Sequence, residues 1–363
     1  MRKQQPLFIA SLAFILVLSL LFTGCSQQKT QQSETQSTAQ SAPFTDKIKF
    51  KMGYLPAVGD ILTFVAKEKG FYEQEGLDVE LFQFTNSGEG LNAIKAGKLD
   101  AGAFGTSAPQ VFIAKGTPFI DIGGMQSEGH AIIAKPENAD QFSSPQGFVG
   151  KKVATVRLAT GDAVWRSAMF KAGIDWKTQV TIQELDSPAA VLEAVKKGAA
   201  DVGLVWVPFS EMAEQQGLQI VSWSSTYMPG HVCCRVVAME DKLQTNKEAY
   251  IRLARANILA YDFYINNQEE TLDIASKYVK LDRELLRKAT YSGNIYSVPD
   301  PDKKGFFAFW EAMKAAGYIQ SDIDISKHVN SEIYKTALDQ LQQRDPQNST
   351  YQKLAKDYVI NNQ

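Results

Sequence analysis

Residues 230–235 bring together more side chains capable of chemistry than any other short segment of the chain. They read Gly-His-Val-Cys-Cys-Arg, so His231 stands two residues before the adjacent pair Cys233 and Cys234. Two thiolates and an imidazole suit a soft metal ion, and His130 would add a second imidazole if the fold brought it near. The spacing matches no standard zinc pattern, and buried cysteines usually pack as small apolar residues. The segment is therefore open to three interpretations: a metal site, a redox or pocket-lining pair, or core packing.

Adjacency limits what the two cysteines can do. The usual geometry of a disulfide does not join neighbouring residues without strain. In a β-strand, alternate side chains point to opposite faces, so only one of Cys233 and Cys234 is expected to face a pocket. No nucleophile–base–orienter order and no paired carboxylates of a hydrolase are visible elsewhere. A binding protein without a cofactor is the leading interpretation, and a metal- or Cys-dependent enzyme is the alternative.

Two stretches of the chain repeat one pattern, and they predict the elements that would position such residues. Residues 91–105 read LNAIKAGKLDAGAFG, and residues 192–206, which begin 101 positions later, read LEAVKKGAADVGLVW. Strand, helix and strand patterns precede each copy, and a helix and another strand follow. The helices over 87–96 and 188–197 end at glycines, as helix ends prefer. Alternating strands and helices indicate βαβ units, and therefore an α/β protein with two lobes, each a mainly parallel sheet flanked by helices.

The last third of the chain has a helical rhythm. Helices are expected over 249–264, 271–279, 283–289, 305–316 and 330–341. Residues 46–134 and 236–345 are assigned to lobe 1, which carries these helices, and residues 135–235 to lobe 2. Residues 346–363 are assigned to a polar tail, either frayed or folded as a closing helix.

Two facing α/β lobes leave a cleft, and parallel sheets bind ligands beyond the carboxyl ends of their strands. Gly, Ser and Thr recur there at helix starts, where they cap the helix or leave backbone N–H groups for an oxyanion. The candidate ligand-binding residues are Tyr54, Asp60, Ser87, Glu89, Thr106, Ser107, Glu128, His130, Thr160, Gly161, Asp162, Trp206, Tyr227, His231 and Arg235.

The N-terminus predicts export. Two cations precede an uncharged apolar run of sixteen residues, 7–22, which is short for a membrane span. The run ends Leu-Phe-Thr-Gly-Cys and resembles a bacterial lipoprotein signal, which implies cleavage after residue 24 and lipid attachment to Cys25. A plain secretory signal is the alternative. Residues 25–45 are mostly Gln, Ser and Thr, a composition typical of a flexible tether.

The segment Gly-Phe-Tyr-Glu-Gln-Glu-Gly-Leu-Asp-Val at 70–79 follows a strand that ends in Gly-Tyr and a first helix. Together with matches at 93–97, 148–153, 206–208 and 317–319, it resembles the solute-binding proteins of ABC importers that serve sulfonates, taurine, nitrate and thiamine-precursor pyrimidines. The resemblance covers roughly residues 47–340. It implies the type II periplasmic-binding-protein fold, hinge segments at 130–135 and 235–239, and lobe closure that presents the solute to a permease and its ATPase.

Acidic residues at the expected rim bear on the ligand. Sulfonate-type members of that family usually offer Gly-Ser-Thr-like donors where this chain has Asp162, and Asp60, Glu89 and Glu128 add further acid. Desolvated like charge beside an anion is costly, which favours a zwitterion, an amine or a neutral nitrogen heterocycle over nitrate or a simple sulfonate. Replacing Asp162 with Ser is accordingly predicted to weaken binding of an amine-bearing ligand.

Basic and aromatic residues complete the expected site. Arg157 and Arg235 are the candidate cations, and either can instead pair with a carboxylate. A planar ligand could stack on Phe82, Trp165, Trp206 or Tyr227. Core packing is the alternative for Phe82 and Trp165.

The composition agrees with a binding protein. The 363 residues carry 38 basic and 40 acidic side chains, a net charge of −2, so nucleic acid is not an expected partner. The expected partners are a small-molecule solute, an ABC permease with its ATPase, and the membrane through the lipid on Cys25. We expect a monomer, exported and anchored at the outer face of the cytoplasmic membrane or in the periplasm. A surface sensor without a transporter is a further alternative.

Overall fold

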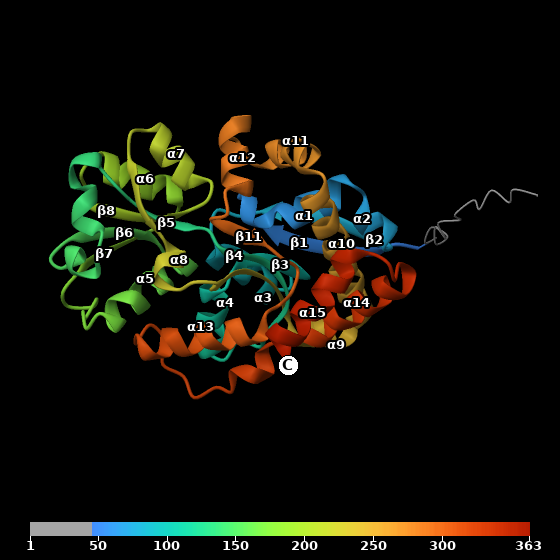
Figure 1. Ribbon diagram of the computed structural model, residues 1–363. Coiled ribbons are helices and arrows are strands. Elements are labelled where there is room, and N and C mark those ends of the chain that lie inside the picture. Colours follow the sequence, from blue (N-terminus) through green and yellow to red (C-terminus); the bar gives the residue numbers. More distant parts are fainter. Residues whose placement is uncertain (1–45) are drawn as a thin grey trace, which may run out of the picture. The chain divides into compact units, whose positions relative to one another are not determined.

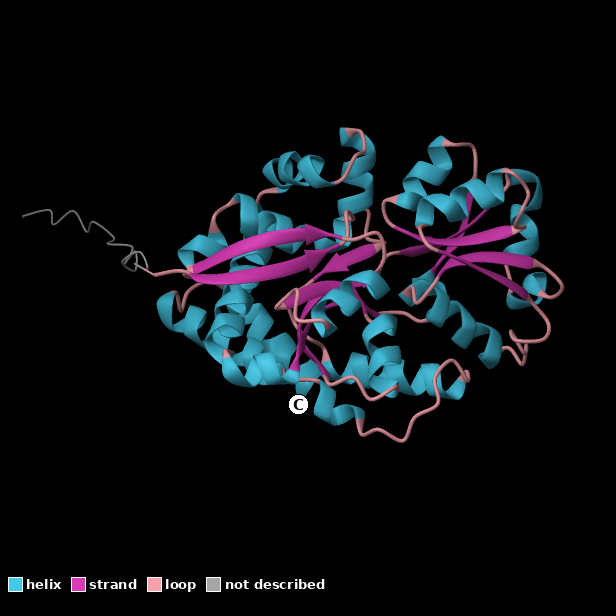
Figure 2. Ribbon diagram, turned by 180° about the vertical axis from the view of Figure 1, so that it is seen from behind, coloured by secondary structure: helices cyan, strands magenta, loops and turns pink. Residues whose placement is uncertain are grey.

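The computed structural model describes residues 46–363, which form two β-sheets flanked by helices (Figures 1 and 2). The predicted signal peptide, Cys25 and the tether lie outside the described residues. Along residues 46–363, no helix combines the length and the apolar character needed to cross a membrane.

A six-stranded sheet with its helices forms the first lobe, and a five-stranded sheet forms the second. The first has the order β11-β4-β10-β3-β1-β2 and consists of β1 (Ile48–Tyr54), β2 (Leu77–Gln83), β3 (Ala101–Gly105), β4 (Phe119–Glu128), β10 (Val232–Met239) and β11 (Ile295–Ser297). The second has the order β7-β6-β8-β5-β9 and consists of β5 (His130–Ala134), β6 (Lys152–Val156), β7 (Thr181–Leu185), β8 (Val202–Trp206) and β9 (Gln219–Trp223).

Helices follow the strands in both lobes. The first lobe has α1 (Ile61–Glu68), α2 (Phe71–Gln74), α3 (Ser87–Lys95) and α4 (Ser107–Ala114), with a short 3₁₀ turn, η1 (Val58–Asp60), before α1. The second lobe has α5 (Thr160–Lys171), α6 (Pro188–Lys196), α7 (Phe209–Gln215), α8 (Ser224–Tyr227) and the 3₁₀ segments η2 (Pro136–Phe142) and η3 (Pro145–Phe148). Gly97 and Gly198 follow α3 and α6 with a φ of +70° each, so the predicted helix ends are confirmed.

The repeat in the sequence is a repeat in three dimensions. β1 pairs in parallel with β3, with Met52 opposite Ala101, and β6 pairs in parallel with β8, with Val153 opposite Val202. Each residue of the second pair stands 101 positions after its counterpart in the first. The two-lobed α/β prediction is therefore confirmed by strand register.

The matched aspartates of the repeat have the same structural task. Asp100 accepts a hydrogen bond of 2.8 Å from the backbone N–H of Lys51, and Asp201 accepts one of the same length from Lys152. Each carboxylate thus links the residue that precedes one strand, β3 or β8, to the backbone of the neighbouring strand, β1 or β6. Matched side chains thus mark matched strand junctions in the two lobes.

The chain crosses between the lobes twice. Gly129 joins β4 to β5, and residues 228–231 join α8 to β10. β5 pairs with β8 and β9 in the second sheet, whereas β10 pairs with β3 and β4 in the first. The sequence placed the lobe boundaries after residues 134 and 235. Both crossings come a few residues earlier, because hydrogen-bonded partners decide which sheet a strand joins.

The last third of the chain is helical, as predicted. Its helices are α9 (Glu240–Thr245), α10 (Lys247–Asn266), α11 (Gln268–Tyr278), α12 (Arg283–Tyr291), α13 (Lys303–Ala315), α14 (Ser331–Arg344) and α15 (Ser349–Asn362), with the 3₁₀ segment η4 (Ile325–His328). Of the two alternatives for residues 346–363, the structure has the closing helix, α15. Asn362 at its end donates a hydrogen bond of 2.8 Å to the buried Asp300, which fastens the helix to the rest of the lobe.

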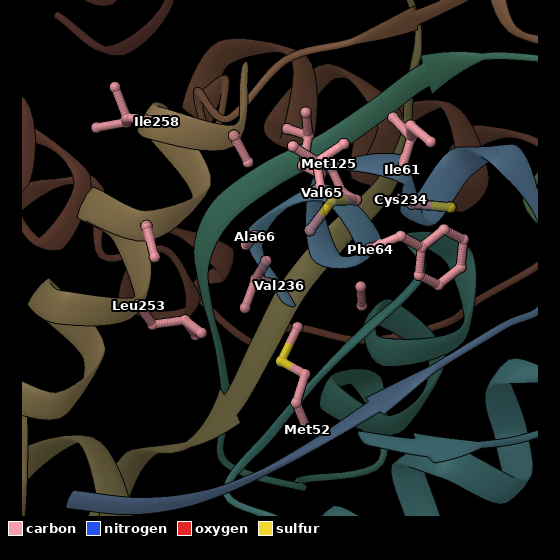
Figure 3. Close-up of a cluster of buried hydrophobic side chains, with 14 of the residues drawn as sticks. Met52, Ile61, Phe64, Val65, Ala66, Met125, Cys234, Val236, Leu253 and Ile258 are labelled. Carbon is pink, nitrogen blue, oxygen red and sulfur yellow. The ribbon is translucent and has the colours of Figure 1, made fainter. Parts of the chain in front are cut away.

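The core of the first lobe lies between its sheet and the helices α1 and α10. In Figure 3, Met52, Phe64, Val65, Met125 and Val236 converge from three strands and α1. Burying an aliphatic or aromatic side chain of this size stabilises a fold by about 1.5–3 kcal/mol. This packed layer holds rigid the strand ends from which the site is built.

Candidate functional site

A cavity lies between the lobes, where strands of both sheets end. About 450 Å³ of space free of protein atoms lies there, open solvent included. Its lining residues are Leu55, Ala57, Gly59, Asp60, Asn86, Ser87, Gly105, Gln126, His130, Val156, Arg157, Ala159, Thr160, Trp206, Cys233 and Cys234. The predicted position beyond the strand ends is therefore occupied by a real cavity, and Asp60, Ser87, His130, Thr160 and Trp206 line it.

Asp60 is the acidic residue of this lining. Its side chain is 1% exposed, and Oδ2 accepts a hydrogen bond of 3.2 Å from the backbone N–H of Leu55. Burial raises the pKa of Asp60 well above its usual value, and the nearby Cys234 adds to the rise. The carboxyl group therefore holds its proton more readily than an exposed aspartate does.

Cys233 and Cys234 both line the cavity, so the prediction that only one could do so is wrong. Between Val232 and Cys234 the strand β10 advances two residues while β4 advances one, which makes Cys233 the extra residue of a β-bulge. The bulge interrupts the alternation of side chains, and the two Sγ atoms lie 3.6 Å apart. Burial and the hydrogen bond with Cys233 raise the pKa of Cys234.

His130 and Trp206 form an aromatic wall on the side of the second lobe. Their rings meet edge to face at 6.3 Å, and His130 Nδ1 lies 3.8 Å from Cys233 Sγ. Burial lowers the pKa of His130 to about 4, so the imidazole is neutral at pH 7. A Cβ atom on Gly161 would lie 2.4 Å from the His130 ring, which explains why the second residue of α5 is a glycine.

Hydroxyl groups join the lobes around the cavity. Ser107 donates a hydrogen bond of 2.5 Å to the Leu158 carbonyl of the other lobe. Thr160 Oγ1 accepts a hydrogen bond from the Ser107 N–H at 3.4 Å and donates one to the Cys233 carbonyl at 3.5 Å. Thr106 also donates to that carbonyl. Ser107 and Thr106 thus position the wall without lining it.

Asp162 does not line the cavity, contrary to the sequence prediction. Its two oxygens bind the guanidinium of Arg166, one turn along α5, at 3.0 and 2.9 Å. Burial raises the pKa of Asp162, and the Arg166 charge opposes the rise. An ion pair inside one lobe therefore accounts for this carboxylate, and it gives no reason to exclude anionic solutes.

The other predicted acids are also engaged or distant. Glu128 accepts a hydrogen bond of 2.6 Å from the Gly230 N–H, and Glu89 is an exposed residue of the first turn of α3. Of the two candidate cations, Arg157 lines the cavity and pairs with Glu184 at 3.5 Å. Arg235 is fully buried and donates to the backbone carbonyls of residues 126, 234 and 301. The rim is consequently far less acidic than the sequence suggested.

The remaining candidates lie away from the main cavity. The Tyr54 ring packs edge to face against Phe64 in the core. Tyr227 lines a smaller neighbouring cavity together with His130, Gly161 and Trp165. Phe82 packs against the apolar core of its own lobe.

The four candidate metal ligands are not assembled into one site. His231 Nε2 lies 2.9 Å from Ser224 Oγ, and burial lowers the pKa of this histidine to about 3. Within the described part of the chain, no group of three or more His, Cys, Asp or Glu side chains is arranged to hold a metal ion.

Sequence reasoning missed two polar lining residues, Asn86 and Gln126. Asn86 caps α3 through the Glu89 N–H at 3.0 Å and donates across the cleft to the Asp186 carbonyl at 3.3 Å. Gln126 Nε2 donates to the Glu128 carbonyl at 2.7 Å, which leaves Oε1 beside Gly59. Both residues stand in strand-end segments that the sequence identified. Their polar side chains at those positions were the signal that could have marked them as lining residues.

Comparison with protein families decides the relationship. Residues 61–271, more than half of the chain, match the family model described as NMT1/THI5 like. The chain belongs to the NMT1/THI5-like family. A Brucella abortus (strain 2308) protein named provisionally as a binding protein is 26% identical over 257 residues, which cover 70% of this chain and 78% of that protein.

A second relative of this NMT1/THI5-like protein is an enzyme. The 4-amino-5-hydroxymethyl-2-methylpyrimidine phosphate synthase of Saccharomyces cerevisiae (strain ATCC 204508 / S288c) is 27% identical over 112 residues, 31% of this chain and 33% of the enzyme. The similarity therefore covers a minor part of both proteins.

Solved structures establish the fold. The ligand-binding component of an ABC-type import system from Staphylococcus aureus, with zinc bound, superposes with a TM-score of 0.69 at 18% identity over 80% of this chain and 99% of that one. The nitrate-binding protein NrtA of Synechocystis PCC 6803 superposes with a TM-score of 0.69 at 18% identity, over 85% of this chain and 93% of that one. The aliphatic sulphonate-binding protein SsuA of Escherichia coli superposes with a TM-score of 0.65 at 17% identity, over 80% of this chain and 100% of that one. The chain has the two-lobed periplasmic-binding-protein fold.

Proposed function

We propose that this protein is the solute-binding component of an ABC importer, exported and held at the membrane by a lipid on Cys25. The observation that carries the proposal is the cavity, which both lobes line at the ends of their strands. Two crossings connect the lobes, one through Gly129 and one through residues 228–231, so a hinge at these points opens and closes the cavity. Closure on a solute would create the surface that a permease and its ATPase recognise.

The lining favours a small organic solute that contains nitrogen or sulfur. Leu55, Ala57, Val156 and Ala159 supply apolar walls, and the Trp206 ring offers a face for a planar group. His130 is neutral at pH 7, so Asp60 and Arg157 are the lining residues that can carry charge. A neutral nitrogen heterocycle or a zwitterion therefore fits better than a bare anion.

Calorimetric titration of the purified protein with sulfonates, nitrate, pyrimidines, flavins and amines tests the proposal. One class is expected to bind in roughly the micromolar range or tighter, and Trp206→Ala should weaken that binding by at least about tenfold. A control is Phe170→Ala, since the Phe170 ring is 50% exposed near the end of α5 and lies outside the cavity lining. Absence of binding across the panel would count against a solute receptor.

The anchor and the transporter call for separate tests. Cys25→Ser should move the protein from the membrane fraction to the soluble exported fraction without changing solute affinity. Retention of the variant in the membrane fraction would contradict lipidation at Cys25. Stimulation of a co-expressed permease–ATPase by the solute-loaded protein would separate a transport receptor from a surface sensor.

An enzyme is the second candidate, because two thiols and a neutral imidazole face the same cavity. Incubating the protein with candidate pyrimidine-forming substrates, with and without Fe²⁺ or Zn²⁺, tests this activity. We expect no product. Turnover that depends on Cys233 or His130 would instead favour catalysis.

A further inference from the structure

Asp60 has an unusual position in the cavity wall. It ends η1 and precedes α1, yet its side chain makes no capping hydrogen bond to that helix. Oδ2 is held by the Leu55 N–H, whereas Oδ1 is buried and has no hydrogen-bond partner anywhere in residues 46–363. Leaving a buried acceptor unpaired costs about 1–3 kcal/mol, so this oxygen is suited to a partner that comes from outside the chain.

The surroundings of Asp60 contain no cation to satisfy it. The titratable groups that interact with it are Cys234 on β10, Tyr54 on β1 and Tyr72 on α2. Cys234 raises the pKa of Asp60, and Asp60 raises the pKa values of the two tyrosines, so none of the three supplies a positive charge. No ion pair to Asp60 forms in the described chain, and Arg157 is paired with Glu184. A solute in the cavity can supply the hydrogen-bond donor that Oδ1 lacks.

Gln126 adds a second acceptor to the same wall. Its Nε2 is fixed on the Glu128 carbonyl, and a Cβ atom on Gly59 would lie 1.8 Å from Oε1. This close approach brings the amide oxygen against the backbone next to Asp60. Within residues 46–363, the one hydrogen bond that Gln126 Oε1 accepts is a long one of 3.7 Å from the Cys234 thiol. This part of the wall offers acceptors rather than donors.

Building on the proposed function, we infer that Asp60 selects the solute by accepting a hydrogen bond at Oδ1 from an amino or ring N–H group. Solutes with such a donor at this end are bound, and oxyanions that present only acceptors there are rejected. Rejection arises because an acceptor-only solute leaves Oδ1 unpaired and places it against another electron-rich atom.

The Asp60→Asn variant provides a directional test. The Leu55 N–H requires an acceptor, so the amide oxygen of Asn must take the place of Oδ2 and turn its NH₂ group into the cavity. The shape of the wall is kept while its acceptor becomes a donor. The variant should therefore reverse the preference, whereas Asp60→Ala should abolish it.

Two probe pairs that differ at one position serve as ligands: 4-aminopyrimidine with 4-methylpyrimidine, and taurine with propane-1-sulfonate. We expect the wild type to bind at least one amino compound roughly tenfold or more tightly than its methyl partner, Asp60→Asn to reverse that difference, and Asp60→Ala to lose it. Asp100→Asn, a carboxylate of the same lobe outside the cavity, should keep it. Thermal unfolding of each variant verifies folding.

Three results would overturn the inference: equal binding within both pairs, unchanged preference in folded Asp60→Asn, or no binding of either amino compound by the wild type. If other solutes still bind in a Trp206-dependent manner, only the role of Asp60 fails. If no solute of the wider panel binds, the proposed function fails with it.

Discussion

At the scale of single residues, burial keeps the two histidines near the cavity uncharged at pH 7. His130 and His231 are both buried, which lowers their pKa values to about 4 and about 3, while burial raises the pKa of Asp60. The neutral imidazole of His130 can therefore offer a solute hydrogen bonds but no charge.

The lowered pKa of His130 predicts acid sensitivity. The folded state binds the proton less readily than the unfolded chain, whose histidine titrates near 6.5. The neutral His130 therefore contributes its full share of the free energy of unfolding above pH 6.5. That share is lost as the pH falls to about 4, by about 3 kcal/mol in total. Urea unfolding from pH 7.5 to 4 measures it.

His130→Gln is the matched variant for that measurement. The raised carboxyl pKa values oppose the histidine effect, but they are common to both proteins and cancel in the difference. The stability gap between wild type and variant should shrink toward low pH. A gap that stays constant over the whole range would contradict a neutral buried imidazole.

Gly161 predicts a steric effect on the site. A Cβ atom there would lie 2.4–2.7 Å from three atoms of His130. Gly161→Ala should displace this ring and weaken solute binding by roughly tenfold, while Gly123→Ala, whose added Cβ atom would meet its nearest neighbour at an ordinary 3.6 Å, tests the general cost of such a change. Calorimetry on both variants compares them, and equal affinities would place His130 outside the binding wall.

At the scale of elements, helix α5 carries a buried ion pair that also bridges the lobes. Arg166 binds Asp162, and its guanidinium lies 4.5 Å from the Trp176 ring and 5.0 Å from that of Tyr318 in the C-terminal segment. Tyr318 also donates to Asp162 at 3.4 Å. The charge of Asp162 thus serves packing between elements.

Replacing Asp162 should affect stability and leave binding unchanged. Asp162→Ala removes the fully buried carboxylate and leaves Arg166 with only the partly exposed Glu184, 3.0 Å away, which we expect to cost about 3 kcal/mol. Denaturant unfolding measures that loss, and calorimetry should give an affinity within about twofold of wild type. The double variant Asp162→Leu with Arg166→Met should recover much of the stability. A large loss of affinity in folded Asp162→Ala would return this residue to the site.

The repeated strand junctions make a paired prediction. Asp100→Ala and Asp201→Ala each remove one hydrogen bond to a backbone N–H, at the same place in the two lobes. Each should cost about 1 kcal/mol in urea unfolding. Very different losses would show that the two junctions are not energetically equivalent.

At the scale of the whole described molecule, hydrogen bonds hold the two lobes in contact around the cavity. Ser107 and Asn86 in the first lobe donate to the Leu158 and Asp186 carbonyls of the second. On the α13 side, the Trp176 N–H donates to the Ala316 carbonyl at 2.9 Å. Cys233 and Cys234 are only 2% and 8% exposed in this arrangement.

Opening of the lobes should therefore control thiol reactivity. A small alkylating reagent reaches Cys233 and Cys234 when the cavity opens, so a bound solute should slow labelling by at least about tenfold. Mass spectrometry of the Cys25→Ser protein follows the reaction at both cysteines. Labelling at the same rate with saturating solute would contradict closure around the ligand.

The sequence by itself determined the α/β class, the two equivalent lobes and the helical last third. These follow from hydrophobic period, helix-ending glycines and a repeat at constant offset, which are local properties of the chain. It also located the strand-end segments that line the cavity, because the carboxyl ends of parallel strands gather at one edge.

Only the tertiary structure decided which side chains in those segments face the cavity. Asp162 turned to Arg166, Glu128 turned to the Gly230 N–H, and Asp60 kept an oxygen without a partner among the described residues. The bulge at Cys233 arises from the register between β10 and β4, strands more than a hundred positions apart. Pairing over such distances depends on how the lobes pack, and no local pattern encodes it.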